Sequence, residues 1–194
     1  MTHDSTTTNV LLSGVGGQGV ILASYVLSQA AMAEGFDVKQ SEVHGMSQRG
    51  GSVVSHLRFG ARVASPIVSM GTADLLLSFE PLEALRYQHW LRPGGLLIYN
   101  AIKVNPSTVA AGLATYPDDI DARISAAWPN SRKVDATSLA EQAGTAKAAN
   151  MVLVGAISSR LPFADDTWRA IIAKVVPPKT VEANMRAFEL GRNA

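Results

Sequence analysis

The sequence SGVGGQG, from Ser13 to Gly19, lies between a short apolar segment and a long alanine-rich one. The preceding segment, NVLLS (Asn9 to Ser13), has the length and apolar character of a buried strand. The following segment, Val20 to Ala33, contains no proline and favours a helix that ends at Gly35. The stretch therefore predicts the turn of a strand–turn–helix unit, where glycines let the backbone approach another group closely.

The glycine spacing fits the pattern GxGxxG, with Gly14, Gly16 and Gly19 in the glycine positions. Between a strand and a helix, such a loop lets a phosphate approach the backbone, and the helix N-terminus favours its negative charge. A dinucleotide site would also need an acid about 20 residues further on, for which Asp37 and Glu42 are candidates. The glycines could instead only permit a tight turn with close helix packing. A Walker loop is excluded, because no Lys-Ser or Lys-Thr follows the last glycine.

Five further segments have the pattern of strands. ADLLLSF (Ala73 to Phe79) and the run from Gly95 to Asn100 are continuously apolar, which is typical of strands buried on both faces of a parallel sheet. FDVKQSEV (Phe36 to Val43) and NSRKVDAT are shorter or more polar candidates. In SVVSHLRFG (Ser52 to Gly60), Val53, Ser55, Leu57 and Phe59 share one face, which predicts a half-exposed or edge strand.

Helices are predicted between and after these strands. They are PLEALRYQHWL with proline in its first turn, Ser138 to Ala143, Ala148 to Arg160, ADDTWRAIIAKVV and PKTVEANMRAFELG, which closes on Gly191. The alternation predicts an α/β fold, Rossmann-like, with a mostly parallel sheet flanked by helices in a single domain over residues 9–194. The polar residues 1–8 are expected to be a disordered lead-in.

Composition excludes several kinds of function. A net charge of +1, from 17 basic and 16 acidic residues, offers no basic surface for nucleic acid. With no cysteine and four scattered histidines, the chain provides neither thiolate ligands for an iron–sulfur cluster nor a zinc motif, so no metal site is predicted. No segment has the signal-peptide pattern or the length of apolar sequence that a membrane span needs, which favours a cytoplasmic protein.

A second glycine-containing stretch, HGMSQRGG, places Arg49 beside Gly50 and Gly51. An arginine can bind a phosphate or carboxylate through two hydrogen bonds at once, although a single arginine is as often a solvated surface residue. His44 and His56 are interpreted as structural or surface histidines, since no Ser/His/Asp arrangement is visible near them. No catalytic residue is predicted.

Taken together, GVGGQG, SQRGGSVVSHLR, ADLLLSFEPLEAL, NMVLVGAI and VEANMRAFELG resemble the gamma subunit family of 2-oxoacid:ferredoxin oxidoreductases over nearly the whole chain. Within that family, EVHGMSQRGG most resembles the beta subunits of indolepyruvate oxidoreductases. Many pyruvate-type members have a tyrosine or phenylalanine near that glycine, so the loop argues against pyruvate as the substrate.

The resemblance implies a subunit of an arylpyruvate oxidoreductase complex that converts a 2-oxoacid to acyl-CoA and carbon dioxide and passes electrons to ferredoxin. Thiamine diphosphate and the iron–sulfur clusters would belong to a large partner subunit, and this chain would help to hold coenzyme A. By position, the phosphate-facing candidates are Gly16, Gly17, Gln18 and Gly19, together with Arg49, Gly50 and Gly51.

Two alternatives remain open from the sequence. One is a stand-alone oxidoreductase with NAD or FAD on the GxGxxG loop, and the other is an interaction module whose loop binds nothing. A subunit that covers a partner's active site should expose apolar surface, and Met46, Met70 and the loop from His44 to Gly51 are the candidates.

Arg49 gives the first testable prediction. Arg49→Ala should weaken coenzyme A binding by the assembled complex by about 1.5–3 kcal/mol, roughly ten- to a hundredfold, because a charge-assisted hydrogen bond is lost. Arg49→Lys should restore only part of the affinity, because a point charge cannot reproduce the planar fork. Titration with coenzyme A measures both, and an unchanged Michaelis constant in a folded Arg49→Ala complex would contradict the phosphate role.

Overall fold

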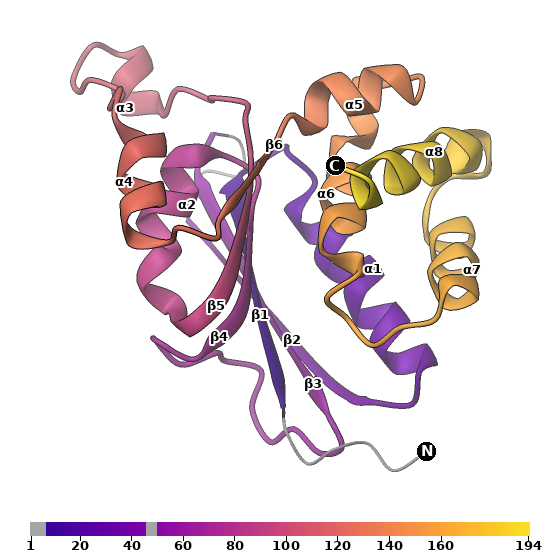
Figure 1. The fold of residues 1–194 in the computed structure, drawn as a ribbon. Coiled ribbons are helices and arrows are strands. Elements are labelled where there is room, and N and C mark those ends of the chain that lie inside the picture. Colours follow the sequence, from indigo (N-terminus) through magenta and orange to yellow (C-terminus); the bar gives the residue numbers. More distant parts are fainter. Residues whose placement is uncertain (1–6, 46–49) are drawn as a thin grey trace.

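The computed structural model describes residues 7–45 and 50–194. Its strands form one sheet in the order β2-β3-β1-β4-β5-β6 (Figure 1). The strands are β1 (Thr8–Val15), β2 (Asp37–His44), β3 (Ser52–Gly60), β4 (Ala73–Ser78), β5 (Leu91–Asn100) and β6 (Arg132–Val134). β1, β4, β5 and β6 are parallel neighbours, whereas β3 is antiparallel to both β1 and β2. The predicted α/β fold with a mostly parallel sheet is confirmed.

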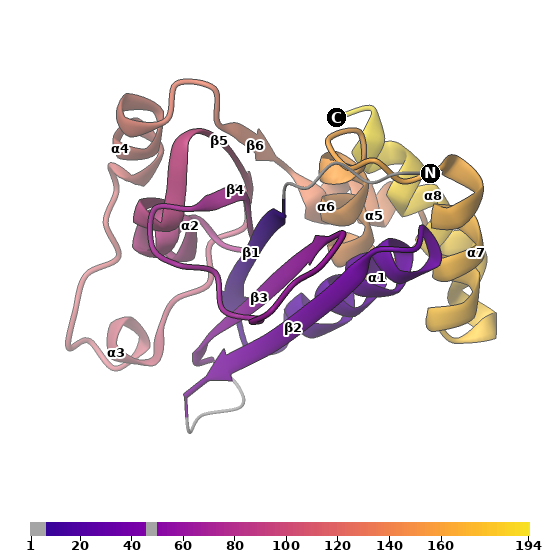
Figure 2. The same cartoon turned by 90° about the horizontal axis from the view of Figure 1, so that it is seen from below.

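Helices cover both faces of the sheet (Figures 1 and 2). One face carries α1 (Val20–Ala33), α5 (Ala136–Gln142), η2 (Ala146–Ala148), α6 (Ala149–Ser158), α7 (Asp165–Val175), η3 (Pro178–Thr180) and α8 (Val181–Arg192). The other carries α2 (Pro81–Tyr87), η1 (Gln88–Trp90), α3 (Ser107–Ala110) and α4 (Ile120–Ala127). Among the helices of the described residues, none is long and apolar enough to cross a membrane.

The apolar strands build two cores because successive side chains point to opposite faces of a sheet. In β4, Leu75 and Leu77 belong to the core beneath α1 and α6, whereas Leu76 belongs to the core beneath α2 and α4. β1 shows the same alternation. This two-sided burial explains why these strands read as continuous apolar runs.

β3 lies inside the sheet, so the predicted half-exposed or edge position is wrong. Its polar residues find partners on both faces instead of water. Ser55 Oγ is 2.7 Å from Ser24 Oγ of α1, and His56 Nδ1 accepts a hydrogen bond from Val68 N at 3.3 Å. The His56 ring packs edge-on against Trp90, and burial lowers the pKa of this histidine. β2 occupies the edge.

Local sequence signals set most element boundaries. α1 spans the predicted residues, and α2 begins with the predicted proline, Pro81. α5 begins earlier than predicted because the Asp135 side chain accepts a hydrogen bond from Ser138 N and caps the helix at Ala136. The short helices α3 and α4 were not predicted, since their sequences lack a long apolar repeat.

Helices α6 and α8 touch through two glycines. A Cβ added to Gly155 would lie 2.0 Å from Phe188 O, and one added to Gly191 would lie 1.9 Å from Val152 O. At these separations the neighbouring atoms are backbone, so neither site accepts even a methyl group without a shift of one helix. The glycines therefore set the distance between α6 and α8.

Gly191→Ala should lower the free energy of unfolding by about 3 kcal/mol, because the methyl group forces the two helix backbones apart. Urea unfolding measures the change. The matched control is Glu182→Ala on the same helix, which removes an exposed ion pair with Arg186. Its free energy of unfolding should stay within about 0.5 kcal/mol of wild type. Equal stability of Gly191→Ala and wild type would contradict the close contact.

Candidate functional site

The glycine loop, residues 16–19, joins the carboxyl end of β1 to α1. Gly17 (φ 105°) and Gly19 (φ 81°) both have left-handed backbone conformations that side chains disfavour. Gly19 is the N-cap of α1, no side chain caps the helix, and its first turn contains no acidic residue. The first amides of α1 thus lack intrahelical acceptors and carry the partial positive charge of the helix N-terminus.

Gly14 has a different role from the loop glycines. It lies within β1, where an added Cβ would stand 2.7 Å from Val20 Cγ2 and 2.8 Å from Phe79 Cβ. The residue therefore permits close packing between β1, α1 and the end of β4, as in the packing interpretation of the glycine pattern.

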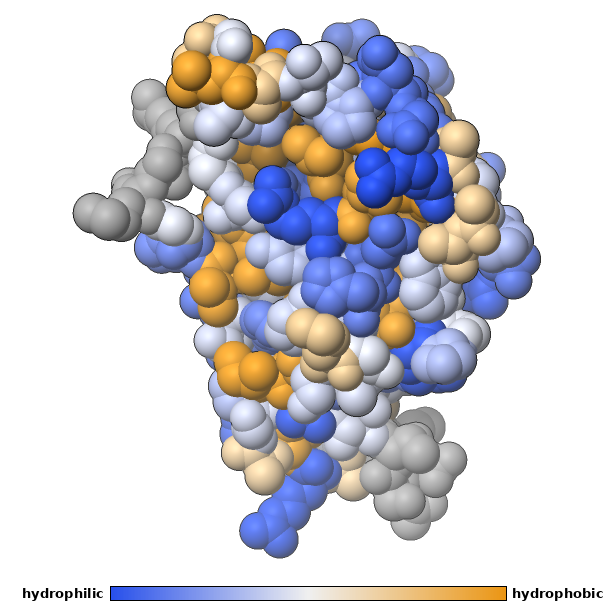
Figure 3. Space-filling view, turned by 90° about the vertical axis from the view of Figure 1, so that its left-hand side faces the viewer, coloured by the Kyte–Doolittle hydropathy of each residue, from blue (hydrophilic) through white to orange (hydrophobic). Residues whose placement is uncertain are grey.

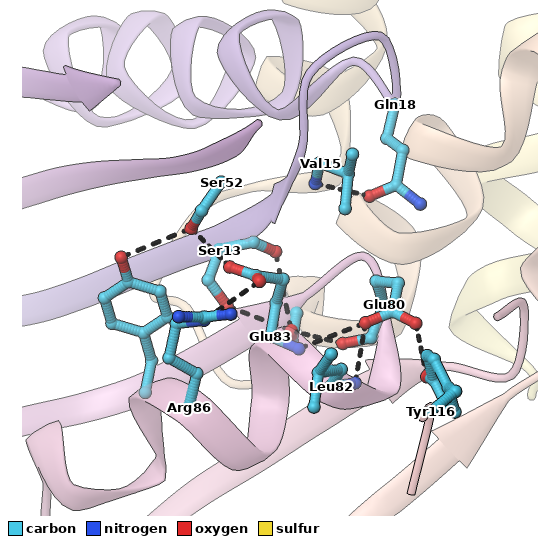
Figure 4. Close-up of polar contacts among 11 residues, drawn as sticks. Ser13, Val15, Gln18, Ser52, Glu80, Leu82, Glu83, Arg86 and Tyr116 are labelled. Carbon is cyan, nitrogen blue, oxygen red and sulfur yellow. Dashed lines mark hydrogen bonds and ion pairs between the residues drawn. The ribbon is translucent and has the colours of Figure 1, made fainter. Parts of the chain in front are cut away.

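Gln18 turns its side chain back into the fold (Figure 4). Its Oε1 accepts a hydrogen bond from Val15 N at 2.8 Å, and its Nε2 donates to Phe79 O at 3.1 Å. Both ends of the amide are thereby used to close the loop and to tie it to the residue after β4. The residue shapes the loop through its side chain, and its own N–H also turns inward, donating to Val15 O at 3.1 Å.

The second glycine segment lies directly against the first. Gly16 N donates to Gly51 O at 2.9 Å, and Gly50 N to Gly16 O at 3.5 Å. Gly50 has a left-handed φ of 73°. The structure thus brings together two segments that the sequence separates by more than 30 residues. Arg49 and Met46 lie outside the described residues.

A buried carboxylate fixes the start of β3 beneath these segments (Figure 4). Glu83 of α2 is only 3% exposed, accepts a hydrogen bond from Ser52 Oγ, and pairs with Arg86 Nε at 3.1 Å. Tyr87 OH is 3.4 Å from the same Ser52 hydroxyl. Burial raises the pKa of Glu83, although Ser52 and Arg86 oppose the shift.

A second buried carboxylate, Glu80, organises the neighbouring loop. It caps α2 by accepting from Leu82 N at 2.6 Å and from Glu83 N at 3.1 Å. Its other oxygen accepts from Val104 N at 3.2 Å and from the Tyr116 hydroxyl. Because this carboxylate is fully engaged in hydrogen bonds, it reads as a structural residue that fastens residues 101–116 to α2.

A pocket of about 720 Å³ opens beside the glycine loop. Its lining combines loop backbone with apolar side chains: Val15, Gly16, Gly17, Gly19, Val20, Ile21, Leu22, Tyr25, His44 and Val53. Ile21 and Tyr25 are 49% and 46% exposed, one turn apart on α1. Sequence reasoning missed these two, because α1 also carries Leu22, Leu27 and Met32, and the sequence alone does not show which of its large apolar residues stay exposed.

Other surface features are less concentrated. Met70, a predicted exposed residue, is 64% exposed. On the face formed by α2, α3 and α4, apolar atoms occur in several groups separated by hydrophilic ones (Figure 3). Within the part of the chain that the structure describes, no cluster of three His, Cys, Asp or Glu side chains could hold a metal ion.

Residues 9–194 match a family model described as pyruvate ferredoxin/flavodoxin oxidoreductase. The chain belongs to this family. The family resemblance seen in the sequence is thereby confirmed, and the chain is of the kind found as a subunit of 2-oxoacid oxidoreductases.

Individual relatives agree with this membership. The chain is 44% identical over 191 residues to the indolepyruvate oxidoreductase subunit IorB of Thermococcus kodakarensis, covering 96% of this chain and 95% of that protein. The gamma subunit of a keto/oxoacid ferredoxin oxidoreductase from Geobacter sulfurreducens has the same fold, with a TM-score of 0.69, 24% identity and 96% of each chain covered. The 2-oxoglutarate:ferredoxin oxidoreductase of Magnetococcus marinus, solved with 2-oxoglutarate, coenzyme A and succinyl-CoA, contains this fold in 31% of its chain, with 98% of this chain covered, 16% identity and a TM-score of 0.71.

The stand-alone dinucleotide enzyme gains no support. In a dinucleotide-binding fold the second strand lies directly beside the first, whereas here β3 stands between β1 and β2. Asp37 pairs with Lys39 and accepts from Val63 N at 2.8 Å, and Glu42 accepts from Gln40 Nε2 at 3.2 Å, both on the edge strand.

Glu83 gives a pH-dependent prediction. Since its folded pKa is raised, its protonation favours folding below the unfolded pKa near 4.5, and this contribution is lost as pH rises through the folded value. In Glu83→Gln that titration is absent, so its unfolding free energy relative to wild type should increase as pH rises from about 4.5 to 7.5. Urea unfolding at several pH values measures the difference, with Glu141→Gln on α5 as the exposed control. A difference that decreases with pH would contradict the burial of this carboxyl.

Proposed function

We propose that the chain is a subunit of an indolepyruvate (arylpyruvate) oxidoreductase complex and contributes the coenzyme A side of the active site. The observation that carries the substrate class is the 44% identity to an indolepyruvate oxidoreductase subunit over nearly the full length of both chains. In the net reaction the 2-oxoacid loses carbon dioxide and its acyl carbon joins the thiol sulfur of coenzyme A. One proton is released, and two electrons pass to ferredoxin.

The division of labour is the one that the family resemblance implies, and side-chain chemistry supports it. A chain without cysteine supplies no thiolate for an iron–sulfur cluster, which fits clusters held by a large partner subunit. The same partner carries thiamine diphosphate, which supplies the carbanion chemistry of decarboxylation. This chain alone binds neither group. We also propose that the complex is cytoplasmic.

The pocket beside the glycine loop fits the two chemical halves of coenzyme A. The amides of Gly17 and Gly19 and the N-terminus of α1 suit phosphate groups. Ile21, Tyr25 and Val53 provide an apolar wall for the uncharged pantetheine arm. Gly50 and Gly51 border the same loop through their hydrogen bonds to Gly16, which supports the assignment of both glycine segments to one site.

Reconstitution with the large subunit tests the function. The chain alone should show no 2-oxoacid oxidation, whereas the complex should reduce ferredoxin only when coenzyme A is present, with a kcat/KM for indolepyruvate at least about tenfold above that for pyruvate. Turnover by the isolated chain, or a stoichiometric flavin or nicotinamide nucleotide in it, would contradict the proposal.

Ile21→Glu tests the coenzyme A side in the same complex. A carboxylate in the first turn of α1 stabilises the helix but repels phosphate, so the Michaelis constant for coenzyme A should rise about tenfold or more without loss of stability. Ile21→Gln is the neutral comparison: it loses the same apolar contact without adding a charge, so the Michaelis constant should rise clearly less than in Ile21→Glu. Equal Michaelis constants for coenzyme A in the two variants would show that no phosphate group binds at this end of α1.

A further inference from the structure

Asn150 is a largely buried residue whose amide nitrogen is available to a ligand. It is the second residue of α6 and only 4% exposed. Its Oδ1 accepts a hydrogen bond from Met151 N at 3.0 Å, and since only the oxygen can accept, this contact fixes which way the amide points. Within residues 7–45 and 50–194, Nδ2 donates no hydrogen bond. Nδ2 is not a buried atom without a partner, so it reaches the surface of the protein although the residue as a whole is buried. A ligand at this position can therefore accept its hydrogens in place of water.

The free amide nitrogen lies against the glycine loop. If Gly19 carried a Cβ, that atom would be 2.7 Å from Asn150 Nδ2 and 3.1 Å from Cγ. Gly19 is the N-cap of α1, so Nδ2 stands beside the uncapped end of that helix. The contact also explains why residue 19 must be glycine, in addition to its φ of 81°.

The first turn of α6 meets the same place. Its own amides are already used, because Ala149 N donates to Ala146 O of η2 and Met151 N donates to Asn150 Oδ1. The uncapped helix end beside Gly19 is therefore that of α1, which favours negative charge. The neutral Asn150 amide adds a directed hydrogen-bond donor there without adding a cation, which suits an oxygen of a phosphate group.

We propose that Asn150 is a ligand-binding residue of the glycine-loop site, donating its Nδ2 hydrogens to a phosphate oxygen held at the N-terminus of α1. The inference rests on the proposed coenzyme A role and extends it to a segment more than 100 residues from the glycine motif. Asn150 would then favour ligands that present a phosphate over thiols or acyl groups without one.

Asn150→Asp is the sharpest test because it separates binding from folding. The aspartate keeps the size and the acceptor for Met151 N, and an acid in the first turn of a helix is stabilising. It removes the donor and brings a negative charge to the phosphate. Stability should therefore stay equal or increase, while the dissociation constant of coenzyme A from the assembled complex should rise about tenfold or more.

Asn100→Asp is the matched control. Asn100 is also 4% exposed and its Oδ1 also accepts a backbone hydrogen bond, from Ala136 N at 3.1 Å, but it lies on β5, two strands from β1. This change should alter the dissociation constant less than about threefold. Asn150→Ala adds a variant without new charge, expected to weaken binding about three- to tenfold.

A direct readout uses the side-chain amide signal of Asn150 in nitrogen-15 NMR of the full chain, with adenosine 3′,5′-bisphosphate as the probe. The signal should shift on titration, and the Asn100 signal should not. If the wild-type complex binds no coenzyme A, the proposed function and this inference both fail. If it binds coenzyme A and Asn150→Asp binds equally well, or the Asn150 signal does not respond, this inference alone is overturned.

Discussion

The hydrogen bond from Gly16 N to Gly51 O, 2.9 Å long, joins the two glycine segments on which the site depends. It continues the antiparallel ladder of β1 and β3 one step beyond the pair Val15 and Ser52. The site therefore exists because β3 inserts beside β1, in the position that a dinucleotide-binding fold gives to its second strand. That insertion also sends β2 to the edge of the sheet.

Buried polar groups hold this arrangement from beneath. Taking a carboxylate out of water is costly unless hydrogen bonds replace its hydration. The two buried carboxylates at α2, Glu80 and Glu83, differ in how many such hydrogen bonds they receive. Glu80 has four donors and is fully satisfied. Glu83 has Ser52 and a partly exposed Arg86, so its pKa is raised by burial. The start of β3 is thus held by a charge that its surroundings only partly compensate.

The local features could be predicted from the sequence, because strand length, helix composition and glycine turns depend on neighbouring residues. The buried strands and α1 follow from such signals. The position of β3 in the sheet does not follow from them. Its alternation of Val53 and Leu57 with polar residues is expected of an edge strand, but it also occurs here inside the sheet, where Trp90 and Val68 N contact the polar residue His56. The inward turn of Gln18 and the contact of Asn150 with Gly19 depend on long-range packing that periodicity does not encode.

That packing explains why segments far apart in the sequence belong together. Gly155 and Gly191 bring α6 and α8 into backbone contact and so determine where α6 lies. The position of α6 in turn places Asn150 against Gly19, at the N-terminus of α1. Because interiors are close-packed and transmit displacement, a methyl group at Gly191 would move the amide at the loop as well as weaken the fold. The three motifs GVGGQG, NMVLVGAI and VEANMRAFELG thus pack against one another in turn. The last contacts the second, and so it affects the site through the position of α6.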